Sequence, residues 1–212
     1  AEQFGNAIRF VVDDGPIPQG AESGATVVSV ARDGWSVQRR GIVPESRIAE
    51  LAGQWFLFVC TGNTCRSPMA AALFRRFLAE RLGCREADLP QRGFVALSAG
   101  ISAAMGAPAS REAIAVMRQK GIDLSPHRSQ PVTLRLSQQA DQIFTMTRTH
   151  RDILVATCPE AADRIQVLAR DGRDVSDPFG WGTEQYERCE EEIERNVRAL
   201  VDQLPLAESP ER

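Results

Sequence analysis

The sequence predicts an α/β fold, a four-stranded parallel sheet with helices on both faces, preceded by a small β-rich appendage. From Trp55 onward, short apolar runs alternate with amphipathic stretches, an order typical of parallel strands joined by crossover helices. The chain has 212 residues and is 43% hydrophobic, which fits one ordinary globular domain with an appendage.

Four apolar runs are predicted to form the sheet. Each is short and is bounded by polar or glycine-containing segments. The predicted strands are residues 55–59, 94–98, 142–146 and 165–168. Because ligands of parallel sheets bind at the carboxyl ends of the strands, we expect the functional site to lie just beyond the first of them, at Cys60.

Helices are predicted between the strands, with recognisable start and stop signals. Ser67 is expected to cap the first helix, Pro68 to open it and Gly83 to end it, while an apolar stripe follows Met69. The predicted caps of the next three helices are Ser110, Thr133 and Thr147. The last helix is expected at residues 184–204, after a polar loop at 170–182.

The first 53 residues differ from the rest of the chain. They predict strands at 8–12, 26–30 and 35–38 and a short helix at 44–51, too few elements to bury a full core. The expected boundaries are a β-rich segment at 1–53, the main domain at 54–205 and a disordered tail at 206–212. The chain begins within what reads as continuing sequence, so we expect it to be part of a longer protein.

Composition excludes several classes of function. A net charge of −3 argues against a nucleic-acid partner, and no apolar run approaches the ~20 residues of a membrane-spanning helix. The N-terminus lacks the basic and then apolar pattern of a signal peptide. Five scattered cysteines predict reduced thiols in a cytoplasmic protein.

The segment from Cys60 to Pro68 predicts a phosphate-binding loop with a nucleophile at its base. It joins a strand end to a helix N-terminus, where backbone N–H groups lack internal partners and bind anions. The same field favours a thiolate at Cys60. The residues expected to surround the anion are Thr61, Gly62, Asn63, Thr64, Cys65, Arg66 and Ser67.

Spacing alone does not select Cys60, because three of the five cysteines have an arginine six residues later. Cys158 lies in a segment without glycine, and Cys189 lies in a helical pattern beside three glutamates. No Asp or Glu occurs between Leu51 and Ala79. Only Cys60 combines a preceding strand, an internal glycine, a following helix and an absence of nearby carboxylates.

These residue types indicate phosphoryl transfer. The Cys60 thiolate can attack phosphorus, and the planar guanidinium of Arg66 matches two phosphoryl oxygens. Asn63 is expected to tie the loop together through its amide, and Ser67 to donate a hydrogen bond to the sulfur. The leaving atom needs a proton, and the candidate donor is Asp177, which Pro178 holds in an extended conformation.

Asp171 and Asp174 are rival acids by composition, but neither precedes a proline.

Together these motifs resemble the low-molecular-weight protein tyrosine phosphatases over residues 55–204. The matching residues are Cys60, Gly62, Asn63, Cys65, Arg66, Ser67 and Pro68, then Ser98-Ala99-Gly100, Ala140-Asp141 and Asp177-Pro178. The resemblance implies two-step hydrolysis of a phosphorylated protein through a phosphocysteine, without metal or organic cofactor. It also implies that Cys65 can trap oxidised Cys60 as a disulfide.

One position bears on the substrate. Tyrosine-directed members usually have a bulky aliphatic residue where this chain has Thr64, and bacterial protein arginine phosphatases resemble it there. They also resemble it at Asp177-Pro178-Phe179-Gly180, so Phe179 is an expected substrate contact. A hydroxyl can pair with guanidinium N–H groups and an aliphatic chain cannot. Phosphoarginine is therefore favoured over phosphotyrosine, with a neutral Thr64 that accepts both as the alternative.

Other interpretations stay open at this point. Arsenate reductases share this fold and loop, but they use two further cysteines close together in sequence. A noncatalytic phosphate-binding module would lack the nucleophile or the acid. Residues 10–15, 23–30 and 37–41 resemble the tail of a YrdC-like threonylcarbamoyl-AMP synthase, which implies an upstream fusion connected with tRNA modification; a small β appendage or linker explains them equally well.

The remaining polar residues receive structural interpretations. His127 and His150 are expected at loop and helix surfaces, too far apart in sequence for a metal pair. Arg75 and Arg76 are expected to be exposed, and residues 190–192, all glutamates, to form a solvated helix face.

Overall fold

The structure is a computed structural model that describes residues 24–31 and 34–205. It divides into two compact units, residues 1–48 and 49–212. The strand predicted at 8–12 and the tail predicted at 206–212 lie outside the described residues. The boundary predicted at residue 53 stays a prediction.

The described part of the first unit is a β-hairpin. Strand β1 (Val27–Ala31) pairs antiparallel with β2 (Gly34–Arg39), close to the predicted positions. Thr26 stabilises the chain leaving the hairpin, because its Oγ1 donates to the carbonyl oxygen of Val43 at 2.8 Å and accepts from the Val43 N–H at 3.1 Å. Helix α1 (Glu45–Leu51) follows and leads into the second unit.

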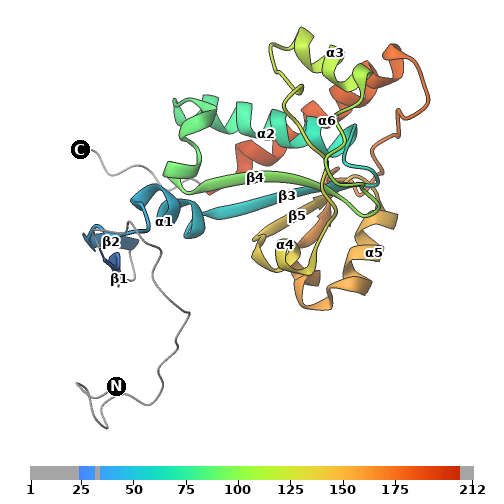
Figure 1. Cartoon of the computed structure of the whole chain (residues 1–212). Coiled ribbons are helices and arrows are strands. Elements are labelled where there is room, and N and C mark those ends of the chain that lie inside the picture. Colours follow the sequence, from blue (N-terminus) through green and yellow to red (C-terminus); the bar gives the residue numbers. More distant parts are fainter. Residues whose placement is uncertain (1–23, 32–33, 206–212) are drawn as a thin grey trace. The chain divides into compact units, whose positions relative to one another are not determined.

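The second unit contains the predicted four-stranded parallel sheet (Figure 1). Its strands are β3 (Gln54–Cys60), β4 (Phe94–Gly100), β5 (Gln142–Thr145) and β6 (Ile165–Val167). Their spatial order is β4-β3-β5-β6, so β3 is central and its end carries Cys60. Cys60 lies in register with Gly100, the last residue of β4.

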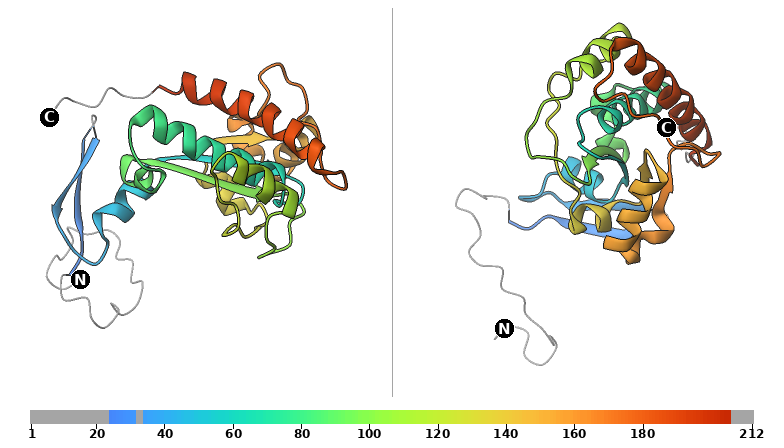
Figure 2. Two further views of the ribbon diagram at one scale, coloured as in Figure 1. Left: turned by 90° about the horizontal axis from the view of Figure 1, so that it is seen from above. Right: turned by 90° about the vertical axis from the view of Figure 1, so that its right-hand side faces the viewer.

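Helices cover both faces of this sheet, as predicted. Helices α2 (Arg66–Leu82) and α6 (Thr183–Gln203) lie on one face with α3 (Arg111–Gln119) beyond them (Figures 1 and 2). Helices α4 (Leu134–Gln139) and α5 (Arg148–Thr157) lie on the other. Short 3₁₀ helices complete the connections at Glu86–Asp88, Pro90–Arg92 and Pro159–Arg164.

Alternation along β3 divides the hydrophobic core into two layers. Phe56 and Phe58 pack with α2 and α6, whereas Leu57 and Val59 pack with residues of α5 and the start of β6. All four side chains are at most 1% exposed. A central strand buried on both faces is rigid, so it fixes the position of the cysteine at its end.

Capping explains where most helices begin and end. Ser110, Thr133 and Thr147 each accept a hydrogen bond from the backbone N–H three residues later, which confirms three predicted caps. Gly83 ends α2 in the left-handed conformation at φ 60°, as expected of a C-terminal glycine.

Ser67 is not a cap, and this prediction was wrong. Helix α2 begins at Arg66, one residue earlier, and Ser67 is fully buried inside its first turn. The side chain of Cys65, the residue in the cap position, makes no capping hydrogen bond. Pro68 has no N–H and the Met69 N–H bonds to the Cys65 carbonyl oxygen at 3.3 Å, so an anion at this helix start depends on the N–H groups of Arg66 and Ser67.

The interpretation of residues 190–192 as a solvated face was wrong for one of the three glutamates. Glu190 is 1% exposed, and burial raises the pKa of its carboxyl although the Lys120 ammonium lies 3.4 Å from Oε2. Its other oxygen has no hydrogen-bond partner among the described residues. Arg75 and Arg76 are likewise partly buried rather than exposed.

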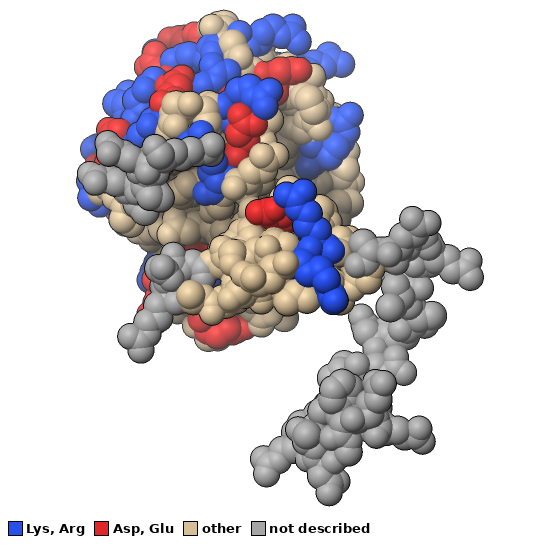
Figure 3. Space-filling view, turned by 90° about the vertical axis from the view of Figure 1, so that its left-hand side faces the viewer, with Lys and Arg blue, Asp and Glu red and all other residues tan. Residues whose placement is uncertain are grey.

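The charged surface shows no dominant sign on the face seen in Figure 3, where basic and acidic side chains lie interspersed. This mixture agrees with the net charge of −3. Within residues 24–31 and 34–205, no helix is both long and apolar enough to cross a bilayer.

Candidate active site

The predicted phosphate-binding loop runs from Cys60, at the end of β3, to Arg66, at the start of α2. It borders a cavity of about 190 Å³. The lining residues are Cys60, Thr61, Gly62, Thr64, Cys65, Arg66, Asp177 and Phe179. The cavity thus gathers the three predicted catalytic residues and five of the seven predicted substrate contacts.

The sulfur of Cys60 lies at the base of the loop, close to a backbone N–H and to a serine hydroxyl that donates to the Ala99 carbonyl oxygen at 3.2 Å. The backbone N–H of Asn63 donates to Sγ at 3.3 Å, and the hydroxyl of Ser67 lies 3.0 Å from it. Cys60 itself is only 3% exposed.

Asn63 and Ser67 do not line the cavity, but they stabilise the loop through buried hydrogen bonds. Asn63 has a left-handed backbone at φ 55°, which asparagine tolerates better than most residues. Its amide nitrogen donates to the hydroxyls of Ser67 and Ser98, both at 2.9 Å, and its amide oxygen accepts from the Gln130 N–H at 2.9 Å. The side chain is fully buried and has all these partners, so it braces the loop.

The loop also packs against the end of β4. A Cβ atom added at Gly100 would lie 2.4 Å from the carbonyl oxygen of Thr61 and 2.9 Å from the backbone nitrogen of Asn63. No side chain fits there without displacing the loop. The Ser-Ala-Gly segment at residues 98–100 therefore supports the curve of the anion-binding loop.

Arg66 and Asp177 meet at the mouth of the cavity. The guanidinium of Arg66 donates from Nη1 to the carbonyl oxygen of Val175 at 3.2 Å and from Nη2 to Asp177 Oδ2 at 2.5 Å. The Arg66 side chain is 5% exposed and that of Asp177 is 50% exposed. Arg66 is therefore fixed by packing, whereas the carboxyl of Asp177 faces solvent and the cavity.

The two rival acids are occupied elsewhere. Asp171 pairs with Arg173 at 2.6 Å, and Asp174 pairs with Arg148 at 3.2 Å. Neither lines the cavity. Asp177 also accepts a hydrogen bond from the Phe179 N–H at 3.2 Å, a short-range turn that Pro178 supports.

Comparison with known proteins agrees with this geometry. Residues 56–209 match the family model for low molecular weight phosphotyrosine protein phosphatases. The chain belongs to this family.

Among curated relatives of this phosphatase, a protein-arginine-phosphatase of Geobacillus stearothermophilus is 39% identical over 153 residues, covering 70% of this chain and 94% of that protein. A solved YwlE arginine phosphatase, in which serine replaces cysteine and is phosphorylated in the active site, has a TM-score of 0.64 at 35% identity, covering 71% of this chain and 95% of that one. A low molecular weight protein tyrosine phosphatase from T. tengcongensis has the same TM-score at 36% identity, covering 72% and 100%.

The other two arginine-spaced cysteines of the phosphatase do not reach the cavity. Cys158 and Cys189 are each 1% exposed, and burial raises the pKa of both thiols, that of Cys189 to about 12. Neither lines the cavity. The discrimination between the three cysteines by their sequence surroundings therefore agrees with their positions in the structure.

Cys65 and Thr64 connect the wall of the cavity to α6 and α3. The sulfur of Cys65 lies 3.1 Å from the hydroxyl of Tyr186, on α6, and 3.5 Å from that of Ser110, the cap of α3. Burial raises the pKa of Tyr186, so it stays a neutral phenol and a possible donor to Cys65. Thr64 lines the cavity, with its hydroxyl 3.6 Å from the Cys65 sulfur.

Both histidines contact the loop, and the sequence analysis missed this role. Nε2 of His127 lies 2.7 Å from the carbonyl oxygen of Asn63. His150 was expected at a helix surface but is 5% exposed, with Nε2 at 2.9 Å from the Thr61 hydroxyl and Nδ1 at 2.9 Å from the Thr147 hydroxyl. No sequence motif joins Thr61 to a residue 89 positions away, so only the fold brings them together.

The environment of His150 predicts a pH dependence of stability. Burial and the Arg66 charge lower its pKa to about 4, below the ordinary value of 6.5, so the unfolded chain binds its proton more readily. Stability from this group is therefore present above pH 6.5 and is lost as the pH falls towards 4. At pH 5 the loss amounts to about 2 kcal/mol relative to pH 7.5.

A urea-unfolding comparison of the wild type and His150→Gln measures this contribution. The free energy of unfolding of the variant is expected to fall less between pH 7.5 and pH 5, by about 2 kcal/mol. His127→Gln serves as the comparison, because burial also lowers the pKa of His127 but its ring contacts the Asn63 carbonyl oxygen and its side chain is only half-buried. Equal pH dependence in the wild type and His150→Gln would contradict the assignment.

Proposed function

We propose that this phosphatase hydrolyses phosphoarginine on proteins through a phosphocysteine intermediate. The observation that carries the proposal is the convergence of Cys60, Arg66 and Asp177 on one cavity at the end of β3. A nucleophile, a planar cation and a carboxyl are the groups that such a two-step reaction needs.

In the first step the Cys60 thiolate forms a bond to phosphorus as the bond to the leaving atom breaks. The N–H groups of the loop and the Arg66 guanidinium bind the three nonbridging oxygens, and the departing nitrogen or oxygen takes a proton from Asp177. The phosphoryl oxygens compete for the Arg66 nitrogen that now pairs with Asp177, which releases that carboxyl to face the leaving atom.

In the second step Asp177, now a carboxylate, takes a proton from water, and the water oxygen attacks phosphorus. The sulfur–phosphorus bond breaks, giving inorganic phosphate and restoring the Cys60 thiolate. The named relative with a phosphorylated serine in place of the active-site cysteine supports a covalent intermediate at this position.

The preference for phosphoarginine rests on Thr64. Its hydroxyl is a hydrogen-bond partner for guanidinium N–H groups on the cavity wall. Overall similarity does not decide between substrates, because an arginine phosphatase and a tyrosine phosphatase are 35% and 36% identical to this chain. The residues around the cavity therefore carry the argument.

The Thr64→Ile variant tests this preference. We expect the wild type to have a higher kcat/KM for phosphoarginine than for phosphotyrosine, and the variant to reverse the order, with the ratio changing at least about tenfold. A loss of one or two hydrogen bonds to a charged group accounts for such a change.

Two further variants separate polarity from size in this experiment. Thr64→Ser keeps the hydroxyl and is expected to keep the preference, whereas Thr64→Val keeps the shape and is expected to lose it. Equal ratios in the wild type and Thr64→Ile would show that Thr64 is neutral, while leaving the phosphocysteine mechanism intact.

The proposed substrate is a phosphorylated protein, and the proposed location is the cytoplasm. All five cysteines lie in the described part of the chain, and each is a free thiol. A reducing compartment keeps thiols in this state. The arsenate reductase alternative is not favoured, because neither Cys158 nor Cys189 lines the cavity beside Cys60.

A further inference from the structure

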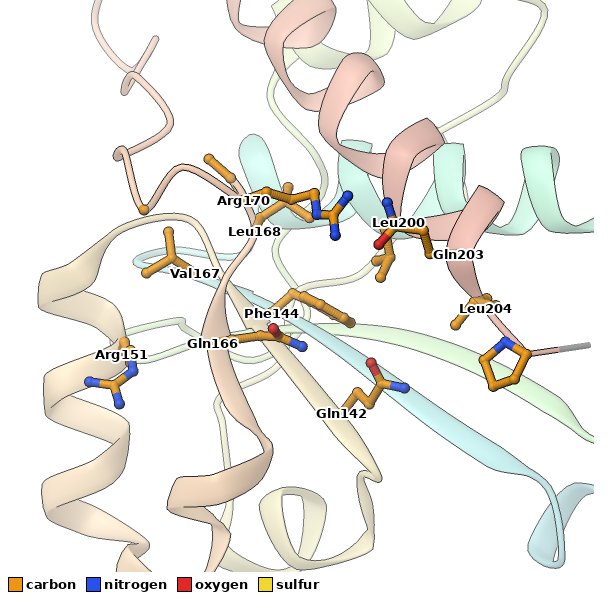
Figure 4. Close-up of a pocket in the computed structure, with 13 residues that line it drawn as sticks. Gln142, Phe144, Arg151, Gln166, Val167, Leu168, Arg170, Leu200, Gln203 and Leu204 are labelled. Atoms are coloured by element: carbon orange, nitrogen blue, oxygen red, sulfur yellow. The ribbon is translucent and has the colours of Figure 1, made fainter.

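A second cavity, of about 490 Å³, lies on the same domain but shares no residue with the candidate active site. It is bordered by β5, the edge strand β6, the loop after β6 and the C-terminal turns of α6 (Figure 4). This volume is within the range of pockets that bind ligands.

The cavity exists because helices cover this face of the sheet unevenly. Phe144 of β5 is in register with Gln166 of β6, so both side chains project from the face on which α2 and α6 lie. Phe144 is buried in the core beneath these helices, whereas Gln166 is exposed. The outer part of the face therefore has an apolar base and polar edges.

The polar groups of the cavity are available for a ligand. The side-chain groups of Gln142, Gln166, Gln203 and Arg170 have no hydrogen-bond partner among the described residues. Figure 4 shows Arg170 extending from the loop after β6 towards Leu200 and Gln203 of α6. The lining contains two arginines and neither Asp nor Glu. Arg151 pairs with Asp152 at 3.3 Å, so the guanidinium of Arg170 is the charge in the lining that favours an anionic ligand.

Two features indicate that the ligand is a peptide. Each glutamine carboxamide offers one carbonyl acceptor and an NH₂ donor, the same pair of groups that a peptide bond presents. Moreover, β6 is the last strand at one side of the sheet, so its outer backbone edge has no strand partner in the part of the chain that the structure describes. An extended segment laid along such an edge gains backbone hydrogen bonds while alternate side chains enter the cavity.

We propose that this cavity binds an extended acidic segment of a partner protein. An aliphatic side chain of that segment packs against Phe144, Leu200 and Leu204, and one of its carboxylates binds Arg170. The apolar base takes the aliphatic group, and the free guanidinium takes the carboxylate. The site is separate from phosphoryl transfer, so its test does not depend on the reaction proposed for Cys60.

A selection experiment tests this proposal. Peptides from a random heptapeptide library are selected for binding to the whole chain, and peptides that also bind the Arg170→Glu variant are removed. We expect the enriched peptides to carry Asp or Glu near Leu, Ile or Val. A fluorescein-labelled copy of the most enriched peptide, followed by anisotropy, is expected to bind Arg170→Glu at least about tenfold more weakly than wild type.

Arg195→Glu is the matched control. Arg195 is exposed on α6, lies outside the cavity and undergoes the same change of charge, so the labelled peptide is expected to keep its affinity within about twofold. Hydrolysis of p-nitrophenyl phosphate is expected to be equal in both variants and wild type, which verifies that each is folded.

Four results would overturn the proposal. The first is that no peptides are enriched, or that the enriched peptides are not acidic. The second is equal peptide affinity for wild type and Arg170→Glu, and the third is displacement of the peptide by an equal concentration of free glutarate. The fourth is binding that appears only when the chain is shortened to end at Pro205. The third would identify a small anion as the occupant, and the fourth this chain's own terminal segment.

Discussion

Replacing Cys60 by alanine is expected to lower kcat/KM for phosphorylated arginine or tyrosine by about 10⁴-fold or more. Among the described residues, Cys60 is the cysteine whose sulfur has a backbone N–H at 3.3 Å and a serine hydroxyl at 3.0 Å, and it lines the same cavity as Arg66 and Asp177. Without it no covalent intermediate forms, and the bound phosphoryl group meets only water.

Cys158→Ala is the matched control for this experiment, because Cys158 also precedes an arginine by six residues but is buried away from the cavity. It is expected to alter stability without changing kcat/KM by more than about twofold. A Cys60→Ala enzyme that retained the wild-type rate would require another nucleophile.

The second large effect is expected from Arg66→Lys, which keeps the positive charge but loses the planar fork. Arg66 uses one nitrogen to hold the Val175 carbonyl and another to reach Asp177, and a lysine has a single nitrogen for both directions. We expect kcat to fall by roughly 10³-fold, with a smaller change in KM, because charge spreads over the phosphoryl oxygens chiefly in the transition state.

Arg76→Lys, on the same helix, provides the comparison. Arg76 pairs with Glu86 at 2.8 Å, outside the cavity, so this variant is expected to keep wild-type kinetics. A fall of the same size in both variants would mean that the effect comes from α2 as a whole rather than from the guanidinium at the site.

The fold, which the structure confirms, and Cys60 as the candidate nucleophile could be predicted from the sequence because both depend on local patterns. The apolar run of β3, the glycine of the loop and the helix after it all lie within residues 54–82. Asp177 lies far along the chain, but the first motif requires an acid and Pro178 distinguishes one aspartate from its neighbours. These inferences used residue type and spacing alone.

What the sequence could not predict depends on contacts between distant segments. Thr61 meets His150 across 89 positions, and Cys65 meets Tyr186 across 121. Glu190 is buried beside Lys120, which follows the last residue of α3. The run of three glutamates in the sequence did not indicate which of them is buried. The contact of Ser67 with the Cys60 sulfur was predicted, but its place inside the first turn of α2 rather than at the cap depends on how the loop closes.

The arrangement also explains why substrate preference is harder to predict than mechanism. The proposed mechanism needs the loop, Arg66 and Asp177, whereas we propose that discrimination between phosphoarginine and phosphotyrosine depends on single side chains such as Thr64. Phe179 lines the same cavity but is 73% exposed, so its contribution is limited to the cavity mouth.

The most direct test of the account is to stop the wild-type enzyme with acid during turnover of phosphoarginine and locate the phosphoryl group by peptide mass spectrometry. We expect one phosphoryl group on the sulfur of Cys60 and none on the peptides that contain Cys158 or Cys189. Rapid turnover that leaves every cysteine unmodified, or a phosphoryl group on a histidine or aspartate instead, would contradict the account.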